Sequence, residues 1–415
     1  MKKLLSVLIA LSAASSPILQ AQDEANYDES KIPDFTLPDP LKFEDGSKVE
    51  NAGQWPKRRA EILALFEEHV YGRLPLNVSR DTVRHEVRKS VPGFLDGKAE
   101  LREVRIFFTA AKTPFMDVLL ILPNSATEKP VPTFLTLNFA GNHSVHASKE
   151  ITITEAWTRE GDHKATEADR GLKASRWAIE KIIDSGCGLA TIYYGEIDPD
   201  TDDGFENGIH AAYGKPKKDE WGSIATWAYG LSVARDYLGT LREVDQRRVA
   251  VMGHSRLGKT SLWAGATDER FALVISNNSG CGGAALSRRR IGEKVKRINT
   301  SFPHWFNDNF QKYNDNEAAL PVDQHQLIAL IAPRRVYIAS AVEDRWADPK
   351  GEFLAGFHAA PVWQLLGKKG VGVDTQPEID TPVGEEIRYH VRTGKHNVLP
   401  YDWENYIKAL KTIGE

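Results

Sequence analysis

The sequence contains little cysteine. Only Cys187 and Cys281 occur among its 415 residues, and no cysteine–histidine spacing typical of a zinc site accompanies them. A protein outside the cytoplasm can form a disulfide, although export does not require one. Both cysteines stand beside glycines next to predicted central strands. We therefore expect two buried free thiols.

An excess of positive charge is also lacking. The 53 lysines and arginines are outnumbered by 57 acidic residues, and no long basic block occurs. Nucleic-acid binding needs a basic patch, so the sequence gives no case for such a partner. Acidic residues gather at 198–207, but without the ligand spacing of an EF-hand. We expect a solvated loop there, and neither a metal nor an organic cofactor.

Long hydrophobic runs are missing, apart from one short run at the N-terminus. Lys2 and Lys3 precede the apolar run 4–14, which is too short to span a bilayer, and a plausible cleavage point follows Ala21. This pattern is typical of a secretory signal peptide. We expect residues 1–21 to be removed and the mature protein to be secreted or periplasmic, with no membrane attachment. A monomer is expected.

The remaining chain has a normal globular composition, with 41% hydrophobic and 27% charged residues. Residues 22–54 are polar and proline-rich and predict a surface extension. We expect residues 55–415 to form one domain with an insertion near 280–323, a stretch too long for an ordinary connection.

Within this domain, apolar strand-like runs first suggest antiparallel pairing and then alternate with helical patterns. This alternation predicts an α/β fold, a three-layer αβα sandwich with a mostly parallel central sheet. The expected strands are 82–88, 101–109, 116–122, 131–139, 188–194, 249–252, 271–276, 335–341 and 386–391. The expected helices are 55–71, 174–185, 221–238, 260–266, 327–330, 352–366 and 403–413.

One stretch of this pattern carries chemistry. The apolar run 249–252 is followed by Gly253-His254-Ser255-Arg256-Leu257-Gly258-Lys259 and then by a helical pattern. A serine at a sharp strand-to-helix turn is typical of the nucleophile elbow of α/β-hydrolases. The match is imperfect, because the second glycine comes one residue later than the usual G-x-S-x-G pattern requires. The alternative is an ordinary turn with an incidental serine.

A base and an acid follow in hydrolase order, each in a loop after a predicted strand. His396 lies in the loop after the last strand and is the candidate base. Asp344 is the first choice for the acid, with Glu343 second and Asp348 third. The backbone N–H after Ser255 would hold the oxyanion. The Arg256 guanidinium would add about 2–4 kcal/mol of stabilisation, unless Arg256 forms a structural salt bridge instead.

The elbow resembles that of the glucuronoyl esterases, carbohydrate esterase family 15, whose pattern is glycine, any residue, Ser-Arg, any residue, Gly-Lys. The stretches 279–283, 346–349 and 394–396 resemble this family as well. The resemblance implies Ser255 as nucleophile, His396 as base and Arg256 as oxyanion stabiliser. It also implies that Lys259, Glu293 and Trp346 line a sugar site. From the residues alone, Lys259 and Glu293 would be solvated.

The sequence departs from the family pattern at Asn278, where many members carry the acid. The acid must then come from the later loop, which favours Asp344. The resemblance implies hydrolysis, through an acyl-enzyme, of the ester between (4-O-methyl-)glucuronic acid on xylan and lignin alcohols. One alternative is an acetyl xylan esterase or another carbohydrate esterase with the same triad. An alternative of another class is a catalytically silent polysaccharide-binding protein.

Overall fold

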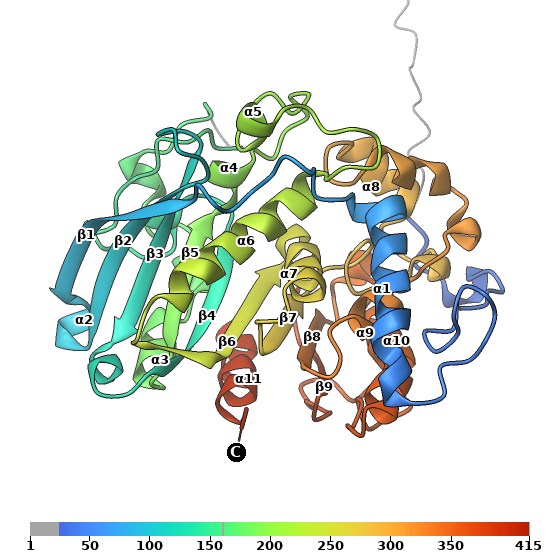
Figure 1. The fold of residues 1–415 in the computed structure, drawn as a ribbon. Helices are drawn as coiled ribbons and strands as arrows, with labels where there is room; N and C mark the ends of the chain where they lie inside the picture. Colours follow the sequence, from blue (N-terminus) through green and yellow to red (C-terminus); the bar gives the residue numbers. More distant parts are fainter. Residues whose placement is uncertain (1–24, 160–161, 415) are drawn as a thin grey trace, which may run out of the picture.

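A computed structural model describes residues 25–159 and 162–414, so the predicted signal peptide lies outside the described residues. A nine-stranded sheet runs through the centre (Figure 1). In spatial order, its strands are β1 (Arg84–Gly93), β2 (Ala99–Phe107), β3 (Phe115–Pro123), β5 (Gly188–Tyr193), β4 (Val131–Asn138), β6 (Val244–His254), β7 (Leu273–Asn277), β8 (Arg335–Ala341) and β9 (Ile387–Arg392).

The sheet has an antiparallel part and a parallel part. β1, β2 and β3 pair antiparallel, and β3 pairs antiparallel with β5. From β5 to β9 every neighbouring pair is parallel. The predicted α/β class with a mostly parallel sheet is confirmed. In such a sheet the loops at the carboxyl ends of the parallel strands meet at one edge, where ligands bind.

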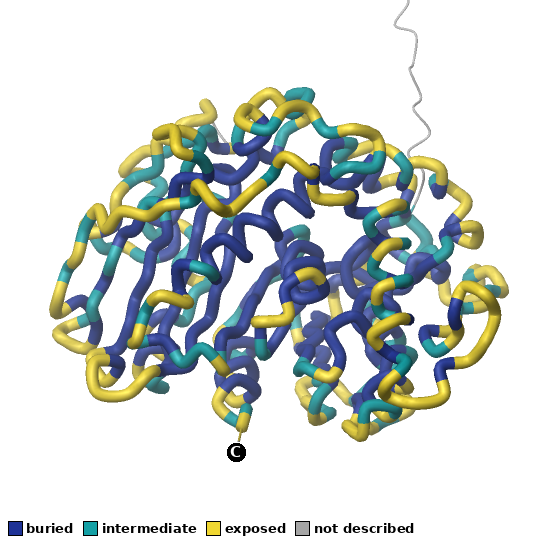
Figure 2. The backbone as a smooth tube through the Cα atoms, viewed as in Figure 1, coloured by how far each residue is buried: buried dark blue, intermediate teal, exposed yellow. Residues whose placement is uncertain are grey.

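Helices cover both faces of the sheet, and each face has its own hydrophobic core (Figures 1 and 2). One face carries α1 (Trp55–Phe66), α6 (Ser223–Gly239), α7 (Arg256–Thr267), α9 (Gln324–Ala329) and α10 (Pro349–Leu365). The other carries α3 (Ile179–Asp184) and α11 (Pro400–Lys411). The short helices α2 (Phe94–Gly97), α4 (Tyr194–Ile197), α5 (His210–Tyr213) and α8 (Val295–Ser301) lie in connections.

The two cores also separate the cysteines. Cys187 packs in one core and Cys281 in the other, and both are buried free thiols, as predicted. The central strands are buried on both faces, which explains why their sequences read as continuous apolar runs. None of the helices in the described part of the chain is long and apolar enough to cross a bilayer.

The segment before α3 differs from the expected pattern. The predicted helix 174–185 is split into a 3₁₀ turn, Ala174–Arg176, and helix α3, because Trp177 leaves the helical path and packs beside Trp403. The segment 280–323 contains α8 and several 3₁₀ turns. Isolated 3₁₀ turns have no 3.6-residue period, so this segment carries no regular hydrophobic pattern in the sequence.

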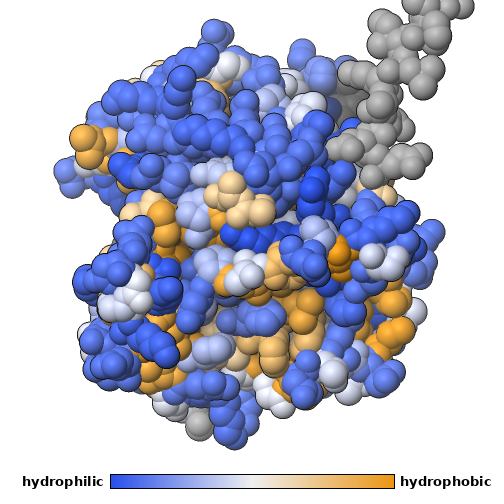
Figure 3. All heavy atoms as spheres, turned by 90° about the vertical axis from the view of Figure 1, so that its right-hand side faces the viewer, coloured by the Kyte–Doolittle hydropathy of each residue, from blue (hydrophilic) through white to orange (hydrophobic). Residues whose placement is uncertain are grey.

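Residues 25–54 lie against this insertion and against α9 and α10. The Asn26 carbonyl accepts a hydrogen bond from the Gly292 N–H at 2.8 Å, and Glu29 pairs with Arg289 and Lys350. The Pro38 carbonyl lies 2.8 Å from Nε2 of His325. Figure 3 shows this side of the molecule as mainly hydrophilic over its upper half, with patches of hydrophobic residues across its lower half.

Candidate active site

Ser255 lies between β6 and α7, at the carboxyl end of the parallel strands. Its backbone has φ 58° and ψ −128°, a conformation that costs a non-glycine residue of order 1–3 kcal/mol. A Cβ on Gly253 would lie 1.8 Å from the Leu257 carbonyl oxygen, so only glycine fits there. A Cβ on Gly258 would lie 2.9 Å from Cβ of Ser279. Gly258, the second glycine of the elbow, therefore lies where α7 approaches the loop after β7. This close approach explains why the glycine comes one residue later than in the G-x-S-x-G pattern.

His396 and Asp344 come together beside this turn. Nδ1 of His396 lies 2.6 Å from Oδ2 of Asp344, and the Asp344 side chain is buried. An ionised carboxylate only accepts hydrogen bonds, so this contact places the imidazole proton on Nδ1 and leaves Nε2 as a base. Glu343 is exposed, and Asp348 instead caps α10 and pairs with Arg289.

Asn278 supports the same carboxylate from the loop after β7. Its Nδ2 donates a hydrogen bond to Oδ2 of Asp344 at 2.8 Å. Position 278, where the resemblance places the acid, and Asp344 are thus neighbours in space. Here the later loop provides the charge and the earlier loop provides a donor. An amide at 278 stabilises the Asp344 charge, whereas a second carboxylate would oppose it.

A second buried acidic residue, Glu352 of α10, binds the backbone of the loop after β7. It accepts hydrogen bonds from the backbone N–H groups of Ser279 and Gly280 at 2.8 and 3.0 Å, and from the Ser340 hydroxyl at 2.6 Å. Burial raises the pKa of Glu352 to about 8. The sequence analysis missed this residue, because a lone glutamate early in a predicted helix carries no distinguishing signal.

Arg256 is held by Asp200, which follows β5. Its guanidinium pairs with the Asp200 carboxylate, which also accepts hydrogen bonds from Nε1 of Trp305 at 2.7 Å and from Tyr194 at 2.8 Å. Nε2 of His304 lies 3.0 Å away. Burial alone would oppose ionisation, but these donors and the Arg256 charge hold the pKa of Asp200 well below its usual range.

The expectation of a solvated loop at 198–207 is therefore wrong for its first part. Asp198 and Asp200 are buried, because Asp198 accepts a hydrogen bond from Ser223 and Asp200 is the partner of Arg256. Within residues 25–159 and 162–414, no three histidine, cysteine or acidic side chains group as metal ligands. Of the two alternatives for Arg256, the structure shows the salt bridge, and stabilisation of the oxyanion by its guanidinium stays a prediction.

One cavity beside Ser255, of about 390 Å³, is lined by Lys259, Glu293, Trp305 and Trp346; we call it the small lobe. Nζ of Lys259 lies 3.2 Å from the Glu293 carboxylate and donates to the Ser279 carbonyl at 2.6 Å. Both charged side chains are at least 90% buried, so the residue-based expectation that they are solvated is wrong. Trp346 is 37% exposed at the rim. Trp305, which the sequence analysis missed, lies under Arg256 and Lys259.

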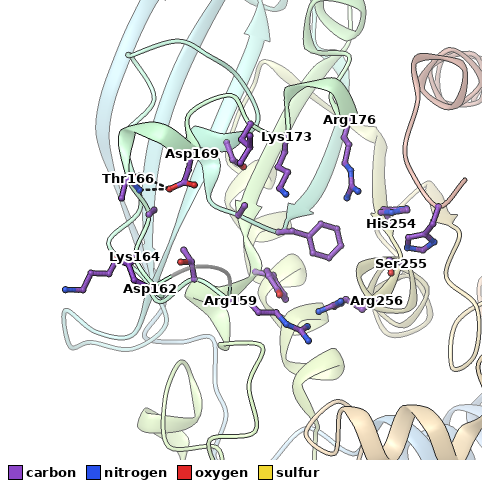
Figure 4. A pocket seen from close by; sticks show the side chains of 18 residues that line it. Arg159, Asp162, Lys164, Thr166, Asp169, Lys173, Arg176, His254, Ser255 and Arg256 are labelled. Carbon is purple, nitrogen blue, oxygen red and sulfur yellow. Dashed lines mark hydrogen bonds between the residues drawn. The ribbon is translucent and has the colours of Figure 1, made fainter. Parts of the chain in front are cut away.

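A second cavity, of about 640 Å³, opens on the other side of Ser255; we call it the large lobe (Figure 4). Ser255, Arg256 and His396 line both lobes. His254 lines the large lobe, with its ring 4.4 Å from that of His396 and its Nδ1 2.7 Å from the Asn277 side-chain oxygen. Burial and the nearby His396 hold the pKa of His254 well below its ordinary value, so this ring is neutral.

Known proteins share this arrangement of sequence and fold. A family model described as glucuronyl esterase of fungi matches residues 183–367. A carbohydrate esterase, MZ0003, from an unknown prokaryotic organism is 51% identical over 97% of this chain and 96% of its own length. The chain belongs to carbohydrate esterase family 15.

Solved structures of this family superpose closely. A promiscuous family 15 esterase from a marine bacterial metagenome has a TM-score of 0.88 and 51% identity, over 94% of this chain and 99% of its own. A glucuronoyl esterase from Solibacter usitatus has a TM-score of 0.88 and 48% identity, over 92% and 99%. The predicted family, the α/β-hydrolase fold and the class of carboxylic ester hydrolase are confirmed.

The contact between Asp344 and His396 predicts that Asp344 is the catalytic acid. In Asp344→Ala the imidazole loses the carboxylate that fixes its tautomer, and we expect kcat/KM to fall about 10³- to 10⁴-fold. In Asn278→Ala only one supporting hydrogen bond is lost, and a decrease of about tenfold or less is expected. Both values are measured on a benzyl ester of glucuronic acid, with circular dichroism as the check on folding. A larger loss in Asn278→Ala than in Asp344→Ala would contradict the assignment.

The burial of Glu352 predicts that the free energy of unfolding depends on pH. Its folded pKa of about 8 exceeds the ordinary value of 4.5, so between these pH values the folded protein holds a proton that the unfolded chain has released. This carboxyl therefore lowers the free energy of unfolding as pH rises from about 5 to 8. Glu352→Gln keeps an acceptor for the two N–H groups and cannot ionise. Urea unfolding at pH 5.5 and 8.5 should show the variant gaining stability relative to the native protein at the higher pH.

The matched control is Glu343→Gln, which changes an exposed carboxylate in the loop between β8 and α10. Its difference in stability from the native protein should remain nearly constant between the two pH values. An equally constant difference for Glu352→Gln would contradict the role given to burial.

Proposed function

We propose that this chain is an exported glucuronoyl esterase that cleaves the ester between (4-O-methyl-)glucuronic acid of xylan and an alcohol of lignin. The observation that carries the proposal is the position of Ser255 at the junction of two lobes, one of which holds a buried lysine–glutamate pair. The likeness to the Solibacter usitatus glucuronoyl esterase supports it. The N-terminal pattern supports export, and we keep the expectations of a monomer without cofactors.

The small lobe suits the uronic acid half of the substrate. A buried charge pair is costly unless its remaining donors and acceptors find partners. Lys259 and Glu293 therefore offer fixed donors and acceptors for sugar hydroxyls, while the Trp346 ring covers an apolar sugar face. An acetyl group has no hydroxyl that could hydrogen-bond to Lys259 or Glu293. The pair therefore favours a uronate over an acetyl ester as the substrate.

In the acylation step, the Ser255 hydroxyl attacks the ester carbonyl carbon and its proton passes to Nε2 of His396. Asp344 stabilises the resulting imidazolium through Nδ1. The carbonyl oxygen becomes an oxyanion, which the backbone N–H of Arg256 receives, since the first residue of a helix has no intrahelical acceptor for its N–H. The Arg256 guanidinium adds a positive charge there.

The tetrahedral intermediate then collapses. The bond to the alcohol oxygen breaks, and the alcohol leaves with the proton that His396 received. Water enters, His396 accepts its proton, and the hydroxide attacks the acyl carbon on Ser255. Breakage of the ester to Ser255 returns the proton to the serine and releases the uronic acid.

The proposal is tested by hydrolysis of benzyl glucuronate beside acetylated xylan, with Ser255→Ala as the control. We expect turnover of the glucuronate ester that is lost in the variant, because no other hydroxyl occupies the elbow. Turnover of acetylated xylan alone would keep the triad and replace the substrate class. The absence of hydrolysis of either substrate would reject the proposal and favour a polysaccharide-binding role.

A further inference from the structure

His254 occupies the one position inside the elbow that the family pattern leaves open, so the turn itself does not require a histidine there. It is the last residue of β6, directly before Ser255, and is only 5% exposed. Figure 4 shows His254 and Ser255 together at one end of the large lobe. In the proposed reaction, neither acylation nor deacylation uses this ring as an acid or a base.

The ring of His254 contacts the ring of the proposed base. The two ring centres lie 4.4 Å apart, with 41° between the planes. His396 stands in the loop after β9, and its side chain is 39% exposed. Its contact with Asp344 fixes Nδ1, and the ring can still swing about that atom. A buried ring against the His396 ring limits this movement.

Asn277 of β7 fixes His254 in turn. Nδ1 of His254 lies 2.7 Å from the Asn277 side-chain oxygen, while Nδ2 of Asn277 donates to the Tyr406 hydroxyl at 2.7 Å. An amide oxygen only accepts hydrogen bonds, so the proton of the His254 ring lies on Nδ1. Tyr406 belongs to α11 and is fully buried. The ring that contacts His396 is therefore tied to both a strand and a helix.

The partners of the two histidines differ in charge. His396 faces a carboxylate, which stabilises an imidazolium, whereas His254 faces a neutral amide. Burial, together with the charges of His396, Arg176 and Arg392, holds the pKa of His254 well below its ordinary value. Phe139, whose ring lies edge-on to that of His254, carries no charge. His254 therefore stays neutral beside a base that must become positive.

Resting on the triad of the proposed function, we propose that His254 is a positioning residue for the base. Its ring holds the His396 imidazole in the orientation in which Nε2 receives the Ser255 proton, and its bond to Asn277 leaves His396 as the group that takes this proton. The proton passes from the serine to His396 and then to the alcohol, and His254 neither gains nor loses one. A second cation at this position would oppose the imidazolium.

Kinetics with two glucuronate esters, methyl and benzyl, test the positioning role. In His254→Ala the base regains its freedom of movement, and we expect kcat to fall about 10- to 100-fold while KM changes little. The loss should be equal for the two esters, because the same base serves either alcohol. A loss confined to the benzyl ester would indicate a contact with the alcohol and would overturn the inference, as would an unchanged kcat.

His254→Phe keeps a ring but can neither ionise nor bond to Asn277. Because the ring contact remains, its kcat should exceed that of His254→Ala by about tenfold. A folded phenylalanine variant no more active than the alanine variant would contradict the role given to the ring. The matched control is His85→Ala, which removes an exposed histidine of β1 whose ring lies 4.8 Å from that of Tyr237. It should leave kcat unchanged.

The protonation of His254 is measured without a substrate, by nitrogen-15 NMR of the native protein with labelled histidine, from about pH 5 to 8. We expect His254 to keep its neutral form, with the proton on Nδ1, while His396 titrates. Its signal is assigned by its loss in His254→Phe, or in His254→Gln where the phenylalanine variant does not fold. Titration of His254 in this range would overturn the inference. Hydrolysis of neither ester by the native protein would instead reject the proposed function, a result that the NMR measurement does not depend on.

Discussion

The backbone at Ser255 is the constraint on which the site depends. Its positive φ is maintained because the Ser255 N–H bonds to the Asn277 carbonyl at 2.9 Å and because Gly253 lets the Leu257 carbonyl approach closely. The turn brings α7 against the edge of the sheet with its first residues at the junction of the two lobes. Arg256 and Lys259 both lie on the first turn of that helix. Arg256 thereby lines both lobes, and Lys259 lines the small lobe.

Asp200 joins this turn to the rest of the cleft. It lies after β5 and is within hydrogen-bonding distance of His304 and Trp305 from the insertion. It also forms ion pairs with Arg256 and Arg159. The insertion that walls the small lobe and the arginine that faces the large lobe are thus fixed to one buried carboxylate. One buried carboxylate thus serves two arginines.

The fold and the candidate triad could be predicted because their signals are local. Buried strands, the glycine-flanked serine, and a histidine and an acid after successive strands can all be read along the chain. Asp200 and Glu352 could not be found in this way, because decisive partners of these two residues are 56 to 104 residues away in the sequence. The acidic residues at 198–207 resemble a solvated loop in the sequence, and only the tertiary contacts distinguish Asp198 and Asp200 from their exposed neighbours.

We propose that Ser255 is the nucleophile and that His396 and Asp344 activate it. Reaction with a serine-directed phosphonate, followed by intact mass and peptide mapping, measures this most directly. We expect one adduct per chain, on the peptide that contains Ser255, and no adduct in Ser255→Ala. No adduct on the native protein, or an adduct on another serine, would contradict it.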